Sequence, residues 1–202
     1  NIAFGLGALG QRPVLVAAVG SDFAEYRGWL ESHGVDCDSV YTSETLHTAR
    51  FICTTDRNHA QIASFYAGAM AQAREIALAP VVERVGGVEL VVVGPNDPEA
   101  MLRHTDECRE RGHRFMADPS QQLAWSDGEA IRRLVDGADL LVTNEYEAAL
   151  TEQKTGWTSD EVLARVGTRV TTLSERGARI ERQDDRPGTV AAVPGLRALE
   201  PT

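Results

Sequence analysis

Apolar residues occur along the chain in short unbroken runs, and these runs alternate with longer segments of helical spacing. The runs at 14–19, 89–93 and 140–142 are almost wholly apolar, which is typical of strands covered on both faces. Segments 98–111 and 128–135 have the spacing of amphipathic helices. Strands that alternate with helices of this length predict an α/β fold with a doubly wound, mostly parallel sheet flanked by helices.

The two ends of the chain predict different elements. Residues 1–9 place apolar side chains on one helical face, and Gly10 is a typical helix end. Near the other end, short strands at 169–173, 178–181 and 189–193 are separated by polar turns. This spacing predicts a C-terminal β-meander that closes one edge of the sheet.

One segment interrupts the α/β alternation. Residues 48–55 and 61–66 are rich in Thr and aromatic residues, and the turn-prone segment 56–59 separates them. We therefore predict a β-hairpin within residues 47–67, which forms either a small lid or a ribbon between the two copies of a homodimer. The rest of the chain is predicted to form one α/β domain that covers residues 1–202.

Composition and charge exclude several classes of function. The chain has 202 residues and a formal net charge of −10, with 30 acidic and 20 basic residues. No cluster of Lys and Arg with interleaved aromatics is present, so nucleic acid and anionic membrane are not expected partners. The three cysteines are widely separated and lack Cys-x-x-Cys spacing, which favours a reducing, cytoplasmic location.

The common catalytic motifs are absent from the sequence. The five histidines have no metal-binding spacing, and no Gly-x-Ser-x-Gly or Walker motif occurs. Gly5, Gly7 and Gly10 lie inside a helical pattern rather than after a strand. A dinucleotide-binding site is therefore disfavoured.

Polar side chains follow the predicted strands and collect at one edge of the sheet. They are Asn96, Asp118, Asn144 and Glu147, together with the hydroxyl- and glycine-bearing turn 172–177. Carboxylates at such an edge suit magnesium, and turn amides and hydroxyls suit phosphate. Asn144 with Glu147 three residues later is equally well explained as a helix cap.

At these positions the chain resembles the PfkB (ribokinase-like) carbohydrate and nucleoside kinases, over nearly its whole length. The matching segments are 1–3 with 9–10, 19–23, 33–36, 144–147 and 172–177. In detail, segments 94–101 and 118–124 resemble those of the bacterial adenosine kinases.

The resemblance implies an ATP- and Mg²⁺-dependent phosphotransferase that acts on a primary hydroxyl of a nucleoside or sugar. Asn144 and Glu147 match the family motif that orders magnesium and phosphate, with Glu147 as the metal residue. Asn1 matches the asparagine that binds the substrate ribose. The ATP-binding turn of the family corresponds to Thr172, Ser174 and Gly177, although the family usually has Gly where this chain has Ser174.

Two family motifs are expected beyond the ends of this sequence. The Gly-Gly pair of the family would precede Asn1, and its Gly-x-Gly-Asp motif, with the catalytic aspartate, would follow Thr202 almost at once. We therefore expect a truncated chain whose general base lies after Thr202, and no catalytic residue is assigned within it.

The aromatic residues of the hairpin bear on the choice of substrate. Phe51 and Phe65 lie on its two arms, where two rings either sandwich a purine or serve as core or dimer-interface residues. Together with the resemblance, they favour phosphorylation of the 5′-hydroxyl of adenosine to give AMP. A sugar kinase of the ribokinase or fructokinase type remains an alternative, as does a non-catalytic relative that only binds the nucleoside or sugar.

Overall fold

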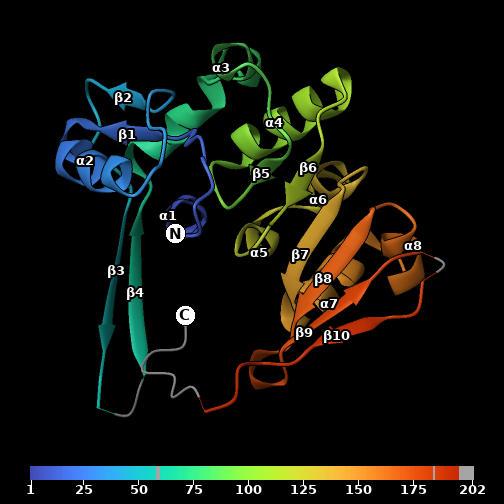
Figure 1. Cartoon of the computed structure of the whole chain (residues 1–202). Helices are drawn as coiled ribbons and strands as arrows, with labels where there is room; N and C mark the ends of the chain where they lie inside the picture. The colour runs from blue at the N-terminus through green and yellow to red at the C-terminus, as the bar shows by residue number, and fades with distance from the viewer. Residues whose placement is uncertain (58–59, 184, 196–202) are drawn as a thin grey trace. The chain divides into compact units, whose positions relative to one another are not determined.

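The computed structural model describes residues 1–57, 60–183 and 185–195. Contacts between residues divide the chain into two compact units, Asn1–Arg84 and Val85–Thr202, and each is described by itself below (Figure 1). The expectation of one domain over residues 1–202 stays a prediction.

A six-stranded sheet forms the second unit, with the strand order β10-β9-β8-β7-β6-β5. Strands β5 to β8 are parallel, and β9 and β10 join as antiparallel neighbours. Their bounds are β5 Val91–Val93, β6 Phe115–Ala117, β7 Leu140–Asn144, β8 Thr168–Thr172, β9 Ala178–Glu181 and β10 Gly188–Val190. The mostly parallel α/β sheet and its C-terminal meander are therefore confirmed.

Helices connect the parallel strands of this sheet. They are α4 Pro98–Arg111, α5 Gln122–Trp125, α6 Gly128–Val135, α7 Glu145–Thr155 and α8 Ser159–Leu163, followed by the 3-10 turn η3 Ser174–Arg176. Helix α4 packs against α6, and α6 packs against α7. Because β5 to β8 follow one another in chain order, right-handed crossovers place these three helices on the same face. The reversal of strand order that defines a doubly wound sheet does not occur within β5–β10.

The two faces of this sheet differ in burial. Phe115, Ala117 and Leu141 are buried on the helix-covered face. On the same face, Arg169 is 3% exposed and forms hydrogen bonds of 2.8–3.0 Å with the carboxylate of Glu181. The residues that alternate with these, such as Met116 and Val170, are only half-buried.

The first unit contains a short parallel pair of strands and several helices. Strand β1 Ala18–Gly20 pairs with β2 Tyr41–Ser43. The helical elements are α1 Ile2–Ala8, the 3-10 turn η1 Ser21–Phe23, α2 Ala24–Ser32, the 3-10 segment η2 Gly68–Glu75 and α3 Leu78–Val85. Val19, Phe23, Leu30, Val35 and Val40 belong to its core.

The strand observed in this part of the chain is shorter than the apolar run at 14–19 from which it was predicted. Only residues 18–20 form β1, and Val14 makes an isolated bridge to Asp36. The segment of the chain that pairs with this run makes a turn between its two contacts, at Asp36 and at β2. In this turn the amide of Val40 donates to the carbonyl of Cys37. This turn interrupts the pairing, so the apolar run forms two separate contacts instead of one long strand.

The predicted hairpin is confirmed. Strands β3 Arg50–Thr55 and β4 Gln61–Tyr66 form a two-stranded antiparallel sheet, and every residue of both strands is exposed. Figure 1 shows the pair extending away from α2 and η2 of the same unit. Two residues of the predicted turn, 58 and 59, lie outside the described residues. The role of the hairpin as a lid stays a prediction.

Across the described part of the chain, no helix combines the length and the apolar character needed to cross a membrane.

Candidate functional site

The structure brings several of the predicted site residues together at one edge of the second unit's sheet. Asn144 is the last residue of β7 and Thr172 the last residue of β8, and the two are direct neighbours in the parallel register. Asp118 follows β6 directly. The carboxyl ends of parallel strands are the usual place for ligands in α/β folds.

Asn144 and Glu147 form a reciprocal cap on α7. The Asn144 side-chain oxygen Oδ1 accepts a hydrogen bond from the Glu147 amide, and Glu147 Oε2 accepts one from the Asn144 amide, both at 2.8 Å. The prediction of a helix cap is therefore confirmed. The cap does not exclude a role in binding, because it fixes the carboxylate of Glu147 at a helix N-terminus beside the strand ends.

Two carboxyl groups face the same region of this edge. Burial, and then the charge of Glu147, raise the pKa of Asp118. A divalent cation between such groups would relieve this repulsion, and oxygen ligands suit Mg²⁺. No group of three or more His, Cys, Asp or Glu side chains in the described residues could hold a metal. Two carboxylates nevertheless fit magnesium, which usually keeps several of its waters.

The turn after β8 has an unusual backbone. Ser174 has φ +54°, a left-handed conformation that costs a non-glycine residue free energy. The Leu173 amide donates to the carbonyl of Gly177 at 2.7 Å, and the Gly177 amide donates to the carbonyl of Ser174 at 3.0 Å. The turn thus adopts a glycine-like conformation although serine occupies position 174, and such strain is typical of binding sites.

Gly177 fits where no larger residue can. It has φ +91° and ψ −130°, and a Cβ atom placed on it would lie 1.9 Å from the carbonyl oxygen of Val190. The turn is therefore packed directly on the backbone of β10 and the residues that follow it.

An ion pair that was not predicted from the sequence joins this turn to α7. Arg176 Nη2 lies 2.5 Å from Glu145 Oε2. Glu145 is the first residue of α7, next to Asn144. The sequence does show residues of opposite charge after two successive strands, Glu145 after β7 and Arg176 after β8. Whether the two charges meet depends on β7 and β8 being paired in the sheet.

Asn96 is engaged in local hydrogen bonds. Its side-chain oxygen accepts a hydrogen bond from the Asp97 amide at 2.8 Å, and its carbonyl oxygen accepts one from Gln122 Nε2, also at 2.8 Å. These bonds shape the loop before α4, so Asn96 contributes to the edge mainly as a structural residue.

The remaining predicted residues belong to the first unit. Asn1 is exposed at the start of α1, and its side chain makes no capping hydrogen bond. Phe51 and Phe65 are 66% and 54% exposed and lie directly opposite each other across the hairpin. Directly opposite residues project from the same face of a sheet. A base would therefore stack against this pair from one side, and would not be enclosed between the two rings as expected from the sequence.

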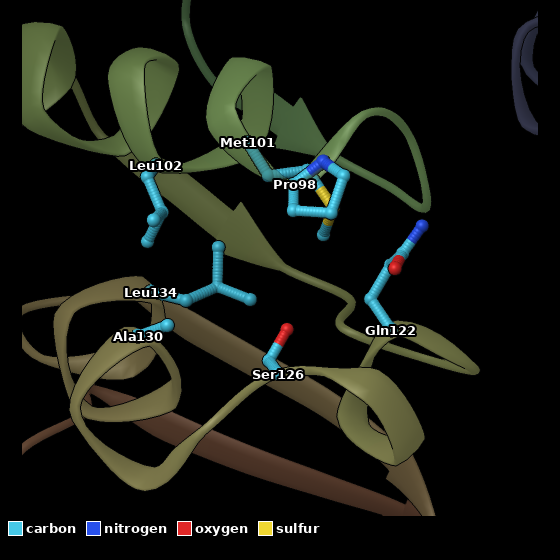
Figure 2. A pocket seen from close by; sticks show the side chains of 7 residues that line it. All are labelled: Pro98, Met101, Leu102, Gln122, Ser126, Ala130 and Leu134. Atoms are coloured by element: carbon cyan, nitrogen blue, oxygen red, sulfur yellow. The ribbon is translucent and has the colours of Figure 1, made fainter. Parts of the chain in front are cut away.

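A small pocket in the second unit does not qualify as a substrate site. It lies among α4, α5 and α6, and the lining residues shown in Figure 2 are mostly apolar, including Met101, Leu102 and Leu134. Its volume of about 20 Å³ is enough for about one water molecule. A nucleoside or sugar needs a far larger space.

Comparisons with known proteins agree with this geometry. Residues 1–201 match the family described as pfkB family carbohydrate kinase. A nucleoside kinase of Methanothermobacter thermautotrophicus is 33% identical over 149 residues, which cover 73% of this chain and 48% of that protein.

Solved structures show the same fold. The nucleoside kinase of Burkholderia thailandensis in complex with inosine matches with a TM-score of 0.90 and 31% identity, over 99% of this chain and 66% of that one. The nucleoside kinase of Methanocaldococcus jannaschii matches with a TM-score of 0.86 and 24% identity, over 98% of this chain and 65% of that one. The chain thus spans about half of the first relative's length and just under two thirds of each structural neighbour.

Proposed function

Because this chain belongs to the pfkB family of carbohydrate kinases, we propose that it forms part of an ATP- and Mg²⁺-dependent kinase that phosphorylates the 5′-hydroxyl of a purine nucleoside, with adenosine as the expected substrate. The observation that carries the kinase proposal is the edge where the cap on α7 and the turn after β8 meet. There Asn144 and Thr172 are neighbours, and the ion pair between Arg176 and Glu145 links the two segments.

Each group at this edge has a role that its chemistry fits. Glu147 and Asp118 would hold magnesium through its waters, and the magnesium supplies positive charge that neutralises the phosphates. The hydroxyls of Thr172 and Ser174 and the turn up to Gly177 would bind the phosphates of ATP. The chain's contribution to phosphoryl transfer is mainly positioning and charge neutralisation.

The choice of a nucleoside rests on the hairpin and on the relatives. The exposed pair Phe51 and Phe65 offers a flat apolar surface of the kind on which a purine stacks. Stacking of a base on an aromatic ring contributes roughly 1–3 kcal/mol in nucleic-acid binders. The kinases of Burkholderia and Methanothermobacter, both above 30% identity, are described as nucleoside kinases.

The magnesium assignment is tested by Glu147→Gln, which keeps a side-chain oxygen for the cap and removes the charge. We expect the magnesium concentration for half-maximal phosphate transfer to rise about tenfold or more. Glu161→Gln is the matched control, because Glu161 forms the same type of capping box with Thr158 on α8. An equal response of both variants would contradict a metal role for Glu147.

The nucleoside assignment is tested by Phe51→Ala and Phe65→Ala. Each substitution should raise the dissociation constant of adenosine by about tenfold or more and leave that of ATP nearly unchanged. Phosphorylation of ribose or fructose in preference to adenosine would support the sugar-kinase alternative. Tight adenosine binding by the intact protein without any transfer would support the non-catalytic alternative.

We further propose that the hairpin joins two copies in a homodimer. Its second face carries Ile52, Ile62 and Tyr66, all exposed, and an isolated two-stranded hairpin is only marginally stable in water. Ile62→Asp should shift the protein towards the monomer in sedimentation velocity, and an unchanged mass would contradict the proposal.

The three free thiols support a cytoplasmic location.

A further inference from the structure

One carboxylate holds the root of the hairpin, by which we mean residues 46–50 before and in the start of β3 together with Gly68 after β4. Asp22, in η1, accepts hydrogen bonds through Oδ1 from the amide and the hydroxyl of Thr48, at 2.9 and 2.8 Å. Through Oδ2 it accepts one from Nη2 of Arg50, the first residue of β3, at 2.6 Å. The hydrogen bonds from Thr48 and Arg50 hold the pKa of Asp22 well below its usual range. The carboxylate is therefore charged at neutral pH, and it accepts two hydrogen bonds from Thr48, just before β3, and one from Arg50, the first residue of β3.

The chain around this carboxylate is packed without space. The Gly20 amide donates to Thr48 Oγ1 at 3.0 Å. A Cβ atom on Gly20 would lie 2.4 Å from the carbonyl oxygen of Leu46, and one on Gly68 would lie 2.3 Å from that of His47. Gly68 follows β4 closely, so both ends of the hairpin meet the same short segment of backbone. The backbone around Asp22 is thus closely packed, and the carboxylate of Asp22 adds the polar contacts that tie Thr48 and Arg50 to η1.

Strand geometry links this attachment to the aromatic pair. Arg50 and Phe51 are successive residues of β3, so their side chains project from opposite faces of the hairpin. The bond to Asp22 fixes the direction of the Arg50 side chain. Together with the bond from the Thr48 amide, it constrains the start of the strand from which Phe51 projects beside its partner Phe65.

We propose that Asp22 is a positioning residue for the nucleoside, which acts through Thr48 and Arg50 by setting the orientation of the hairpin face that carries Phe51 and Phe65. This inference rests on the proposed function, since it assumes that the aromatic face receives the base. Asp22 touches neither the base nor ATP in this scheme.

Asp22→Asn tests the proposal with little change in shape. The amide oxygen can still accept from Thr48, but the amide NH₂ that replaces Oδ2 cannot accept from Arg50. We expect amide hydrogen exchange in β3 and β4 to accelerate by about tenfold, because a charge-assisted hydrogen bond is lost. The KM for adenosine should rise by about tenfold, while the KM for ATP and the kcat at saturating adenosine stay within about twofold. A general loss of stability would not raise the KM for adenosine alone while the KM for ATP and the kcat stay nearly constant.

Asp36→Asn is a matched control in the same unit. Asp36 is also held by an arginine, with Arg84 Nη1 and Nη2 at 2.9 and 3.0 Å from its two carboxylate oxygens. Arg84 lies in α3, not in the hairpin. The control should leave both the hairpin exchange and the adenosine KM unchanged. Arg50→Gln should reproduce the effect of Asp22→Asn, and the double variant should add little, because both changes break the same contact.

The exchange and kinetic measurements separate the role of Asp22 from the identity of the substrate. Unchanged exchange in the hairpin of Asp22→Asn overturns the proposal, whatever the kinetics show. Faster exchange with an unchanged adenosine KM overturns the positioning role and also contradicts the hairpin as the site of the base. If the protein phosphorylates only sugars, the proposed substrate fails, and the exchange data still show whether Asp22 orients the hairpin.

Discussion

Replacing Gly177 by alanine tests whether the turn after β8 is built around one close approach of two backbones. The new Cβ atom would meet the carbonyl oxygen of Val190 at 1.9 Å, the nitrogen of Ala192 at 2.7 Å and the carbonyl carbon of Ala191 at 2.8 Å. All three are backbone atoms, so no side chain can rotate away to make room.

Two effects of similar size contribute to the expected loss of stability. A non-glycine residue at φ +91° and ψ −130° costs about 1–3 kcal/mol in backbone strain. Displacing the backbone of β10 adds about 1–3 kcal/mol, as overpacking does elsewhere. The sum of roughly 2–6 kcal/mol is a large share of the about 5–15 kcal/mol that stabilises a typical domain.

Urea unfolding measures this loss, and ATP binding by calorimetry measures its effect on the site. We expect the free energy of unfolding to fall by the sum above and ATP affinity to fall by about tenfold or more, since the turn must move. Gly112→Ala is the control, because Gly112 has φ +69° and a Cβ atom placed on it would meet nothing within 4 Å. It isolates the backbone strain and should cost about 1 kcal/mol. A Gly177→Ala variant no less stable than Gly112→Ala would refute the close approach.

Three further predictions follow from single residues of the second unit. The pKa of Asp118 is raised above 3.8 by burial and by Glu147, so its charged form destabilises the fold as pH rises through the raised pKa. Asp118→Asn should therefore increase the free energy of unfolding more at about pH 7 than at about pH 4. An equal increase at both pH values would contradict this linkage. Ser174→Gly should stabilise the protein by about 0.5–1 kcal/mol in urea unfolding, because glycine adopts φ +54° without strain; a loss of stability would show that the serine side chain is needed. Arg169→Ala should destabilise the protein by about 3–5 kcal/mol in the same assay, because it leaves the buried carboxylate of Glu181 without its main partner, whereas a small effect would show that water reaches Glu181.

The first and last residues of some helices could be predicted from the sequence, because the residues that begin and end a helix lie within or next to it. Helix α4 covers 98–111 as expected, since Asp97 accepts a hydrogen bond from the Ala100 amide and Gly112 ends the helix in the left-handed conformation. Helix α6 covers 128–135 for the same reason, with Asp127 as its cap. Such signals act within a few residues and need no knowledge of the fold.

Other elements depend on distant partners and were missed. Strand β2, at 41–43, exists because it pairs with β1, and the 3-10 segment η2, at 68–75, packs against β1. Neither has a strong periodic pattern of its own. The apolar run at 14–19 failed as a continuous strand because its partner turns away, which hydrophobicity alone cannot reveal.

Four features follow from local sequence alone: the α/β alternation, the hairpin, the cap formed by Asn144 and Glu147, and the motifs that the chain shares with its family. Each of these is written in residues close together along the chain. By contrast, the fold determines that Arg176 meets Glu145, 31 positions away, and that Asp22 holds Thr48, 26 positions away. It also determines that Phe51 and Phe65 share one face, because the register of the hairpin is set by the pairing of two strands. Local patterns fix which elements form, and the side chains that meet are fixed by how those elements pair.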